Sequence, residues 1–249
     1  MVISEKFTLN GIEGFSKNMY IVTFDSDVLI NKGIPFSRNI NSIDGYSQFN
    51  PMFRDEDTPP DDIILNFMYI ENNMPQIWDE EKILDVKKWI ITDDFIPFTT
   101  QDNPNYIYYL MCKKIQNKMT PEGLGVLECT FTPFSHFAYN AYNSTITVKS
   151  SKNIVIDNPS IYSYEPIIKI KNLGNEETVN KIGDLEVTGL ATNEKVTIDN
   201  IMLTVINENN ENRFSKCNRN WVSLSPGENI VPVSGNCEIE ILCEFPISL

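Results

Sequence analysis

The strongest constraint on the fold is a strict alternation of apolar and acidic residues late in the chain. Cys237, Ile239, Ile241, Cys243 and Phe245 occupy every second position, and three of the four positions between them are glutamates. Successive side chains of a β-strand point to opposite faces of a sheet. This period of two therefore predicts a strand with one buried face and a largely acidic outer face.

Short strand signals dominate the rest of the chain. Runs rich in Ile, Val, Thr and Tyr are bounded by Asn, Asp, Gly and Pro, which is typical of strands joined by turns. In the first half, residues 106–112 and 124–131 are predicted strands. Residues 113–123, which contain Pro121 and Gly123, are interpreted as a long hairpin connection.

Eight strands are predicted after residue 140. They cover residues 145–148, 154–156, 167–171, 185–188, 195–199, 202–206, 229–233 and 237–245. Short strands at this spacing within about 100 residues favour a β-sandwich or a jelly roll.

One amphipathic helix is predicted at about residues 80–92. Asp79 is a suitable N-cap, and two glutamates follow it at the positive end of the helix dipole. Ile83, Val86, Trp89 and Ile90 fall on one face at helical spacing. The predicted fold class is therefore mainly β, with one helix packed against the sheet of the N-terminal part.

A domain boundary is predicted near residue 140, where an aromatic run ends and the series of short strands begins. The first predicted domain is 1–140 and the second is 141–249, with the last residues free to return to the first domain. Residues 1–140 contain 11 basic and 20 acidic residues (11 − 20 = −9), and residues 141–249 contain 9 and 14 (9 − 14 = −5). Both halves are thus acidic, and neither resembles a nucleic-acid arm.

Composition excludes several classes of function. The 249 residues are 41% hydrophobic, which suffices for one large domain or two ordinary ones. The net charge of −14 opposes binding to phosphates or anionic membranes, and the densest basic group, Lys113, Lys114 and Lys118, is followed closely by two glutamates. No apolar segment is long enough to span a membrane, and the first 15 residues lack a signal pattern. We therefore expect synthesis and retention in the cytoplasm.

The residues that could support catalysis are scarce. His136 is the only histidine, and it stands among aromatic residues, which favours a packing role at the domain junction. The five cysteines have no close paired spacing, which fits reduced core thiols. No phosphate-binding glycine loop or nucleophile elbow is present, and a single histidine argues against zinc. We predict no catalytic, cofactor-binding or metal-binding residues, no cofactor and no enzymatic activity.

Three further features have structural interpretations that compete with functional ones. The acidic run from Asp55 to Asp62 lacks the ligand spacing of a calcium loop, so it is interpreted as a solvated loop. Two carboxylate pairs could be imagined as glycosidase acids, but they fit a helix start and an outer strand face. These pairs are Asp79 with Glu81 and Glu238 with Glu240.

The three tryptophans could each offer a stacking surface for a sugar. Trp89 lies on the apolar helix face and is predicted to be core, while Trp78 is left open. Trp221 is expected to begin a strand and fits either role.

Motifs spread over nearly the whole chain resemble the distal tail proteins of long, non-contractile phage tails. In the first half they are residues 7–11, 20–24, 43–45 and 63–67, the Trp89 helix, residues 106–112, and the Phe131-Thr132-Pro133 signature. In the second half they are residues 165–170, the turn Ser225-Pro226-Gly227-Glu228-Asn229, and residues 234–235. A Pro-Gly-x-Asn turn occurs in many β-proteins, so the resemblance rests on the order and spacing of the motifs.

The resemblance implies a structural role in a phage or prophage tail tip. The N-terminal belt domain would form a hexameric ring, or two stacked rings, and the C-terminal domain would be a galectin-like sandwich. The implied partners are the tail tube protein, the tail-associated hub or lysin protein and the tape-measure protein. The implied location is the virion tail, assembled in the host cytoplasm. DNA would pass through the ring without specific binding, and we hypothesise that part of the acidic charge of residues 1–140 lines the channel. Like-charged copies repel, so ring closure would need apolar contacts or paired strand edges.

The sequence departs from sugar-binding galectins. Their site uses a His-x-Asn-Pro-Arg stretch and a later Trp-x-x-Glu, whereas the C-terminal half has no histidine and Leu224 stands where the Glu would be. A scaffold role is therefore favoured. The main alternative is a carbohydrate-binding adhesion module that contacts the host surface through Trp221 and scattered tyrosines. A cell-wall hydrolase is the third reading, and no catalytic constellation supports it.

Overall fold

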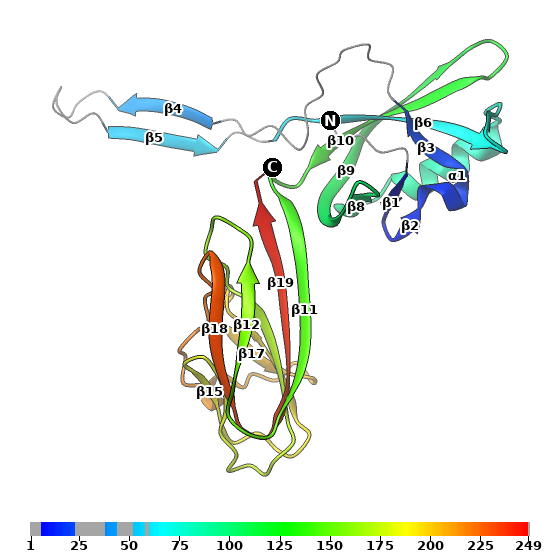
Figure 1. Ribbon diagram of the computed structural model, residues 1–249. Helices are drawn as coiled ribbons and strands as arrows, with labels where there is room; N and C mark the ends of the chain where they lie inside the picture. The colour runs from blue at the N-terminus through cyan, green and yellow to red at the C-terminus, as the bar shows by residue number, and fades with distance from the viewer. Residues whose placement is uncertain (1–5, 23–37, 44–51, 58–59, 249) are drawn as a thin grey trace. The chain divides into compact units, whose positions relative to one another are not determined.

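The structure is a computed structural model that describes residues 6–22, 38–43, 52–57 and 60–248 (Figure 1). It divides into two compact units, residues 1–138 with 248–249, and residues 139–247. Each unit has its own buried apolar cluster. The predicted fold class is confirmed, since strands dominate both units and α1 is the one α-helix in the described part of the chain.

The first unit is an antiparallel sheet with one helix. Strands β9 and β10 pair with each other. On the far side of β10, β6 pairs with β10 and β3 pairs with β6. On the far side of β9, β8 pairs with β9, β1 pairs with β8 and β2 pairs with β1. Its elements are β1 Phe7–Leu9, β2 Ile12–Glu13, η1 Gly14–Lys17, β3 Met19–Val22, β4 Arg38–Ile43, β5 Met52–Asp57, β6 Ile63–Glu71, β7 Met74–Pro75, α1 Glu80–Ile90, β8 Ile96–Thr100, β9 Asn103–Met119 and β10 Gly125–Pro133.

The helix α1 forms as its sequence predicts. The Asp79 carboxylate accepts a hydrogen bond from the Lys82 N–H at 2.6 Å, which satisfies one of the free donors at the helix start. Val86, Trp89 and Ile90 are buried, and Ile83 packs against the same core. The helix ends two residues earlier than predicted because Ile91 takes an extended conformation.

The first core is rich in aromatic rings. Phe7 lies 5.1 Å from Phe67 and 5.9 Å from Trp89, measured between ring centroids. The Trp89 indole N–H donates to the Leu9 carbonyl at 3.2 Å, so the burial of this polar group is compensated. The predicted core role of Trp89 is confirmed.

The predicted connection over residues 113–123 is wrong. Strand β9 continues to Met119 and pairs with β10 down to Gly125, so only Thr120–Leu124 form the turn. The sequence does not indicate this part of the strand, because Lys113, Lys114 and Lys118 are exposed and interrupt the alternation of apolar and polar residues. Gly123 occupies the turn with φ +85°, a conformation that a residue with a Cβ adopts only under strain.

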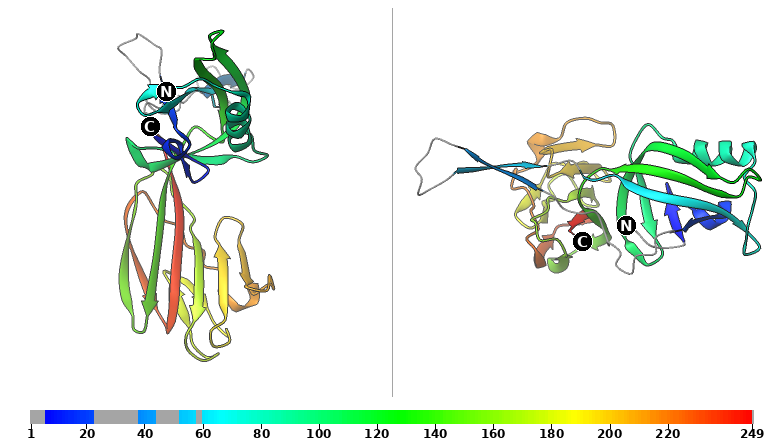
Figure 2. Two further views of the ribbon diagram at one scale, coloured as in Figure 1. Left: turned by 90° about the vertical axis from the view of Figure 1, so that its right-hand side faces the viewer. Right: turned by 90° about the horizontal axis from the view of Figure 1, so that it is seen from above.

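The second unit is a β-sandwich. One sheet has the order β17-β16-β13-β19-β11 and the other has the order β12-β18-β14-β15. Its elements are β11 Ala138–Val148, β12 Lys152–Asn158, β13 Ile167–Asn172, β14 Asn180–Ile182, β15 Leu185–Val187, β16 Lys195–Asp199, β17 Thr204–Asn207, η2 Phe214–Lys216, β18 Gly227–Ser234 and β19 Cys237–Ile247. The red strand β19 lies between green neighbours in Figure 2, in agreement with its position between β11 and β13.

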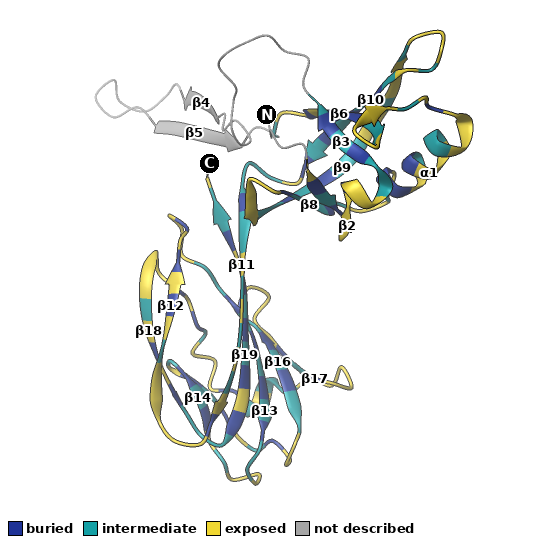
Figure 3. Ribbon diagram, turned by 45° about the vertical axis from the view of Figure 1, so that its right-hand side comes forward, coloured by how far each residue is buried: buried dark blue, intermediate teal, exposed yellow. Residues whose placement is uncertain are grey.

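The predicted alternation along residues 237–245 is confirmed. The five apolar residues of Cys237–Phe245 are buried and form part of the second core. Glu240 lies on the outer face and forms an ion pair with Lys169 of β13 at 3.2 Å. Buried positions alternate with half-buried ones along β13, and with half-buried or exposed ones along most of β19 (Figure 3).

All eight strands predicted after residue 140 are present; residues 195–199 match β16 at both ends, and the others differ at one end or both. The strand predicted at residues 202–206 starts only at Thr204, because Met202 belongs to a turn. Strand β14 was not predicted, since its three residues Asn-Lys-Ile show no pattern. The predicted Pro-Gly-x-Asn turn is confirmed: Gly227 has φ +84°, and the Asn229 side chain bonds both the N–H and the carbonyl of Ser225.

Candidate assembly surfaces

The residues considered for chemistry do not converge on one site. Asp79 caps α1, and Glu240 pairs with Lys169. His136 is half-buried in the bend between β10 and β11. In the described part of the chain, no group of three or more His, Cys, Asp or Glu side chains could hold a metal ion, and no helix is long and apolar enough to cross a membrane.

The acidic run is not a single loop, which corrects the prediction. Asp55 and Asp57 lie in strand β5, paired with β4, and Thr58 and Pro59 lie outside the described residues. Asp62 accepts a hydrogen bond from Lys113 at 2.7 Å and one from the Thr132 hydroxyl at 2.7 Å. These two bonds hold the pKa of the Asp62 carboxyl below its usual value. Asp62 therefore joins β9 and β10 to the start of β6.

Two tryptophans have packing roles that the sequence left open. Trp78 is buried, and its indole N–H donates to the Gly125 carbonyl at 2.9 Å, which anchors the β9–β10 turn. Trp221 lies in no strand, contrary to prediction, because the next N–H, that of Val222, donates to the Asn200 side chain. The Trp221 ring packs partly against the second core and lies 6.0 Å from Phe214.

The cysteines are free thiols. Four of the five are buried, and Cys112 is half-buried. Burial raises the pKa of Cys237 to about 11 and that of Cys243 to about 12, and it also raises the pKa of Cys129. Since the thiolate is the nucleophile, these thiols are unreactive near neutral pH.

Strands of the first unit have edges without partners among the described residues. Strands β4 and β5 pair with each other from Arg38–Asp57 to Ile43–Met52 and with no other described strand. Strand β3 pairs with β6 on one side, and no described strand pairs with its other side. Unpaired edges offer rows of backbone donors and acceptors to another chain.

The outer side of α1 exposes apolar and basic side chains together. Leu84 is 53% exposed and Ile91, just past the helix end, is 58% exposed. Lys88 is exposed and Lys87 is half-buried between them. We call Leu84, Lys87, Lys88 and Ile91 the helix stripe.

Two loops at one end of the sandwich expose large apolar side chains. Ile161 and Tyr162 lie in the connection from β12 to β13, and Ile201, Met202 and Leu203 lie in the turn from β16 to β17. Ile161 and Met202 are each 70% exposed. The loops share one end because Ile167 pairs with Asp199 where β13 begins and β16 ends. We call these five residues the apolar tip.

Sequence reasoning missed the apolar tip. The sequence pattern places Met202 in the strand predicted at residues 202–206, and it assigns no role to Ile161. A signal was available, since apolar residues stand in both segments beside turn formers such as Asn158, Ser160 and Asn200.

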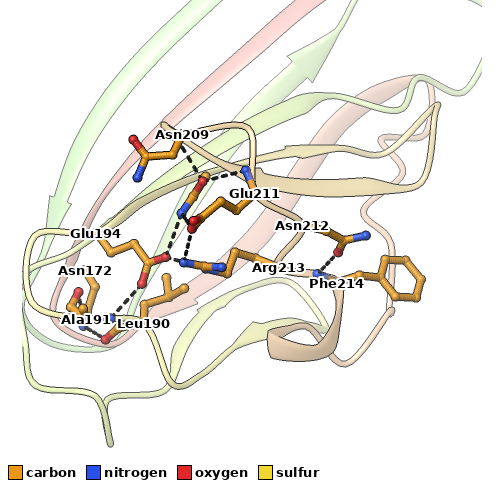
Figure 4. Close-up of polar contacts among 10 residues, drawn as sticks. Asn172, Leu190, Ala191, Glu194, Asn209, Glu211, Asn212, Arg213 and Phe214 are labelled. Carbon is orange, nitrogen blue, oxygen red and sulfur yellow. Dashed lines mark hydrogen bonds and ion pairs between the residues drawn. The ribbon is translucent and has the colours of Figure 1, made fainter.

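A polar network closes the opposite end of the sandwich (Figure 4). The Arg213 guanidinium bonds Glu194 at 2.6 Å and Glu211 at 2.7 Å. Burial acts to raise the pKa of Glu194, but hydrogen bonds from Arg213, the Ala191 N–H and Asn207 outweigh it and hold the pKa below its ordinary value. The buried Asn172 side chain donates to the Leu190 carbonyl at 2.8 Å and bonds Asn180. The network ties loops together and contains no unpartnered acid or base.

Comparison with known proteins gives consistent relatives. The family model described as phage tail protein N-terminal domain matches residues 2–133. The SPbeta prophage-derived uncharacterized protein YomH of Bacillus subtilis (strain 168) is 23% identical over 247 residues, covering 96% of each chain.

Two solved structures share the fold. The Dit protein of SPP1, described as a paradigm of the hub adsorption apparatus in phages that infect Gram-positive bacteria, has a TM-score of 0.63 at 12% identity. The alignment covers 96% of this chain and 98% of that one. A chain of the phage p2 baseplate in its activated conformation with Sr has a TM-score of 0.50 at 10% identity, covering 96% and 97%.

Proposed function

This chain belongs to the phage tail protein family defined by that N-terminal domain and has the fold of a distal tail protein, and we propose that it builds a phage or prophage tail tip. It acts there as a structural protein without enzymatic activity. Its copies form a hexameric ring, or two stacked rings, that joins the tail tube protein to the baseplate or tail-associated hub protein. The ring surrounds the tape-measure protein and then lets DNA pass.

The observation that carries the ring is the β4–β5 hairpin. An isolated two-stranded hairpin is marginally stable in water, and it becomes stable when it joins a larger sheet or packs on another surface. No described strand of the same chain pairs with it. A neighbouring copy can supply the missing pairing through an open edge, such as that of β3.

The two halves would divide the work. The strand-pairing contacts of the ring belong to residues 1–140, because the β4–β5 hairpin, which pairs with no other described strand, lies there. Residues 141–249 form a peripheral scaffold, because the two sheets of the sandwich cover each other's apolar faces.

Charge supports the passage of DNA without retention. Phosphates bind proteins through lysines and arginines that are free to replace counterions. In the densest basic group, Lys113 pairs with Asp62 at 2.7 Å and Lys118 pairs with Glu128. The acidic excess of residues 1–140, part of which we propose lines the channel, would further repel the duplex.

The location that follows is the virion tail, with assembly in the host cytoplasm. The test is the mass and shape of the purified protein, alone and mixed with the tail tube and hub proteins of its phage. Light scattering should give about six times 28.5 kDa or twice that, and negative-stain images should show rings. A single copy under all these conditions would contradict the proposal.

A paired variant tests the hairpin. Replacing Asn41 and Phe53 by proline removes backbone donors from β4 and β5, so ring formation should be lost while the cores stay folded. The matched control replaces the same residues by the β-formers threonine and tyrosine and should still form rings. Rings that survive both prolines would remove the hairpin from the contact.

A further inference from the structure

The apolar tip is an exposed surface held in place. Asp199 accepts hydrogen bonds from the N–H groups of Ile201 and Met202 at 2.9 and 2.8 Å. Leu203 has φ +55°, a left-handed conformation that is unfavourable for a residue with a Cβ. The turn therefore presents Ile201 and Met202 to solvent in a fixed, strained shape, and such strain persists only where surrounding bonds enforce it.

Two buried asparagines fix the tip to the sandwich. Asn200 donates to the Pro166 carbonyl and accepts from the Val222 N–H at 2.8 Å. Asn158 donates to the carbonyls of Tyr162 and Leu224 at 2.9 and 3.0 Å. A rigid apolar surface loses little conformational entropy on binding, which favours a protein contact.

The chemistry around the tip specifies the partner. The segments that meet at this end, residues 157–168, 198–204 and 221–229, contain no Lys or Arg and include Asp157, Glu165 and Glu228. A complementary surface must therefore combine apolar side chains with positive charge.

The helix stripe of the same chain has that chemistry. Leu84 and Ile91 stand seven positions apart, about two helical turns, so they lie on one face with Lys87 and Lys88 between them. Two apolar anchors flanking positive charge match an apolar surface with an acidic border.

We propose that the apolar tip of one copy binds the helix stripe of the next copy. This inference rests on the proposed ring and adds a second contact to it. The contact is heterologous, because each copy contributes its apolar tip to one neighbour and its helix stripe to the other. Such a contact can repeat around a closed ring. It would also place the second unit of each copy against the first unit of its neighbour.

Charge-carrying variants test the contact. Met202→Lys puts a positive charge opposite Lys87 and Lys88, and Leu84→Glu puts a negative charge opposite the acidic border. Each should raise the dissociation constant of the ring about tenfold or more. The double variant should recover part of the loss, because the new Lys and Glu then face each other across copies. Ile230→Lys, an exposed apolar site on β18, is the matched control and should leave the constant unchanged.

Cross-linking tests which chains meet. Chains with Met202→Cys are mixed with chains carrying Ile91→Cys and treated with a short bismaleimide. A product of two chains should form only in the mixture, since the native thiols are buried or half-buried. If the mixture gives no product of two chains under conditions in which rings form, the proposal is overturned.

The outcomes separate the two proposals. If the unaltered protein forms rings and Met202→Lys forms them with the same dissociation constant, the tip contact is wrong and the ring stands. If the unaltered protein forms no ring, alone or with its tail partners, both are wrong.

Discussion

The second unit is tied together by buried polar side chains, whereas the first contains a two-stranded hairpin, β4–β5, that pairs with no other described strand. Buried asparagines at positions 158, 172, 180, 200 and 207 tie the loops of the sandwich to its strands. The first unit has only Thr100 as a buried polar residue in its described part, and it relies on an aromatic core. The chain thus combines a sandwich whose buried polar groups are bonded internally with a hairpin whose outer edges would be paired only in the proposed ring.

The largest expected effect comes from the aromatic core of the first unit. Phe67 is fully buried against Phe7 and Phe131, so Phe67→Ala should destabilise this unit by about 3–5 kcal/mol through lost burial and a cavity. The measurement is denaturation followed by the fluorescence of Trp78 and Trp89, in a Trp221→Phe background. A denaturation midpoint equal to that of the Trp221→Phe parent would contradict the prediction.

The next largest effect tests how much a buried asparagine stabilises the second unit. Asn172→Ala would leave the Asn180 amide and the Leu190 carbonyl without this partner, which should cost the second unit about 3 kcal/mol. Hydrogen exchange in β13 and β16 measures it. Asn220→Ala, at an exposed position, is the control and should change stability by less than about 0.5 kcal/mol. Equal effects of the two variants would refute a special role for Asn172.

A smaller effect is expected at the helix start. Asp79→Ala removes the cap of α1 and should destabilise the first unit by about 1 kcal/mol, while Asp79→Ser should retain most of the stability. Thermal melts of the three proteins decide this. No difference between Ala and Ser would show that the cap contributes nothing.

The smallest effect concerns pH and the second unit. The pKa of Glu194 is lower in the folded chain than its ordinary value of 4.5, so folding favours its ionised form. Its contribution is present above the unfolded pKa and is lost as the pH falls through the folded pKa. Stability should therefore fall below about pH 4.5, and Glu194→Gln should weaken that fall. An unchanged acid limb in the variant would rule Glu194 out as its cause.

Strand β19 and helix α1 were predictable because a single period dominates each. The apolar face of β19 has period two, and that of α1 follows an N-cap at helical spacing. The sequence predicts that β9 ends at Cys112, because the residues after it include lysines. In the structure β9 continues to Met119, since its pairing with β10 outweighs that polarity. Strand β14 is too short to show a pattern, and tertiary pairing with β18 and β15 defines it.

The type of assembly contact could be predicted from the sequence, but its location could not. A negative chain that assembles needs apolar contacts or paired edges, and that expectation came from the sequence. Which edges stay open depends on pairings between distant segments. The apolar tip depends on how Asn158 and Asn200 fold two loops, and local sequence does not report such bonds.

The central position of β19 has a consequence during translation. Its neighbours β11 and β13 leave the ribosome long before it, and the main sheet stays split between them until the chain has been made at least to Ile247. Closing so distant a pair is slow because a long loop must be ordered first. Nascent chains of the second unit therefore expose apolar strands for most of their synthesis, which makes them natural clients for chaperones.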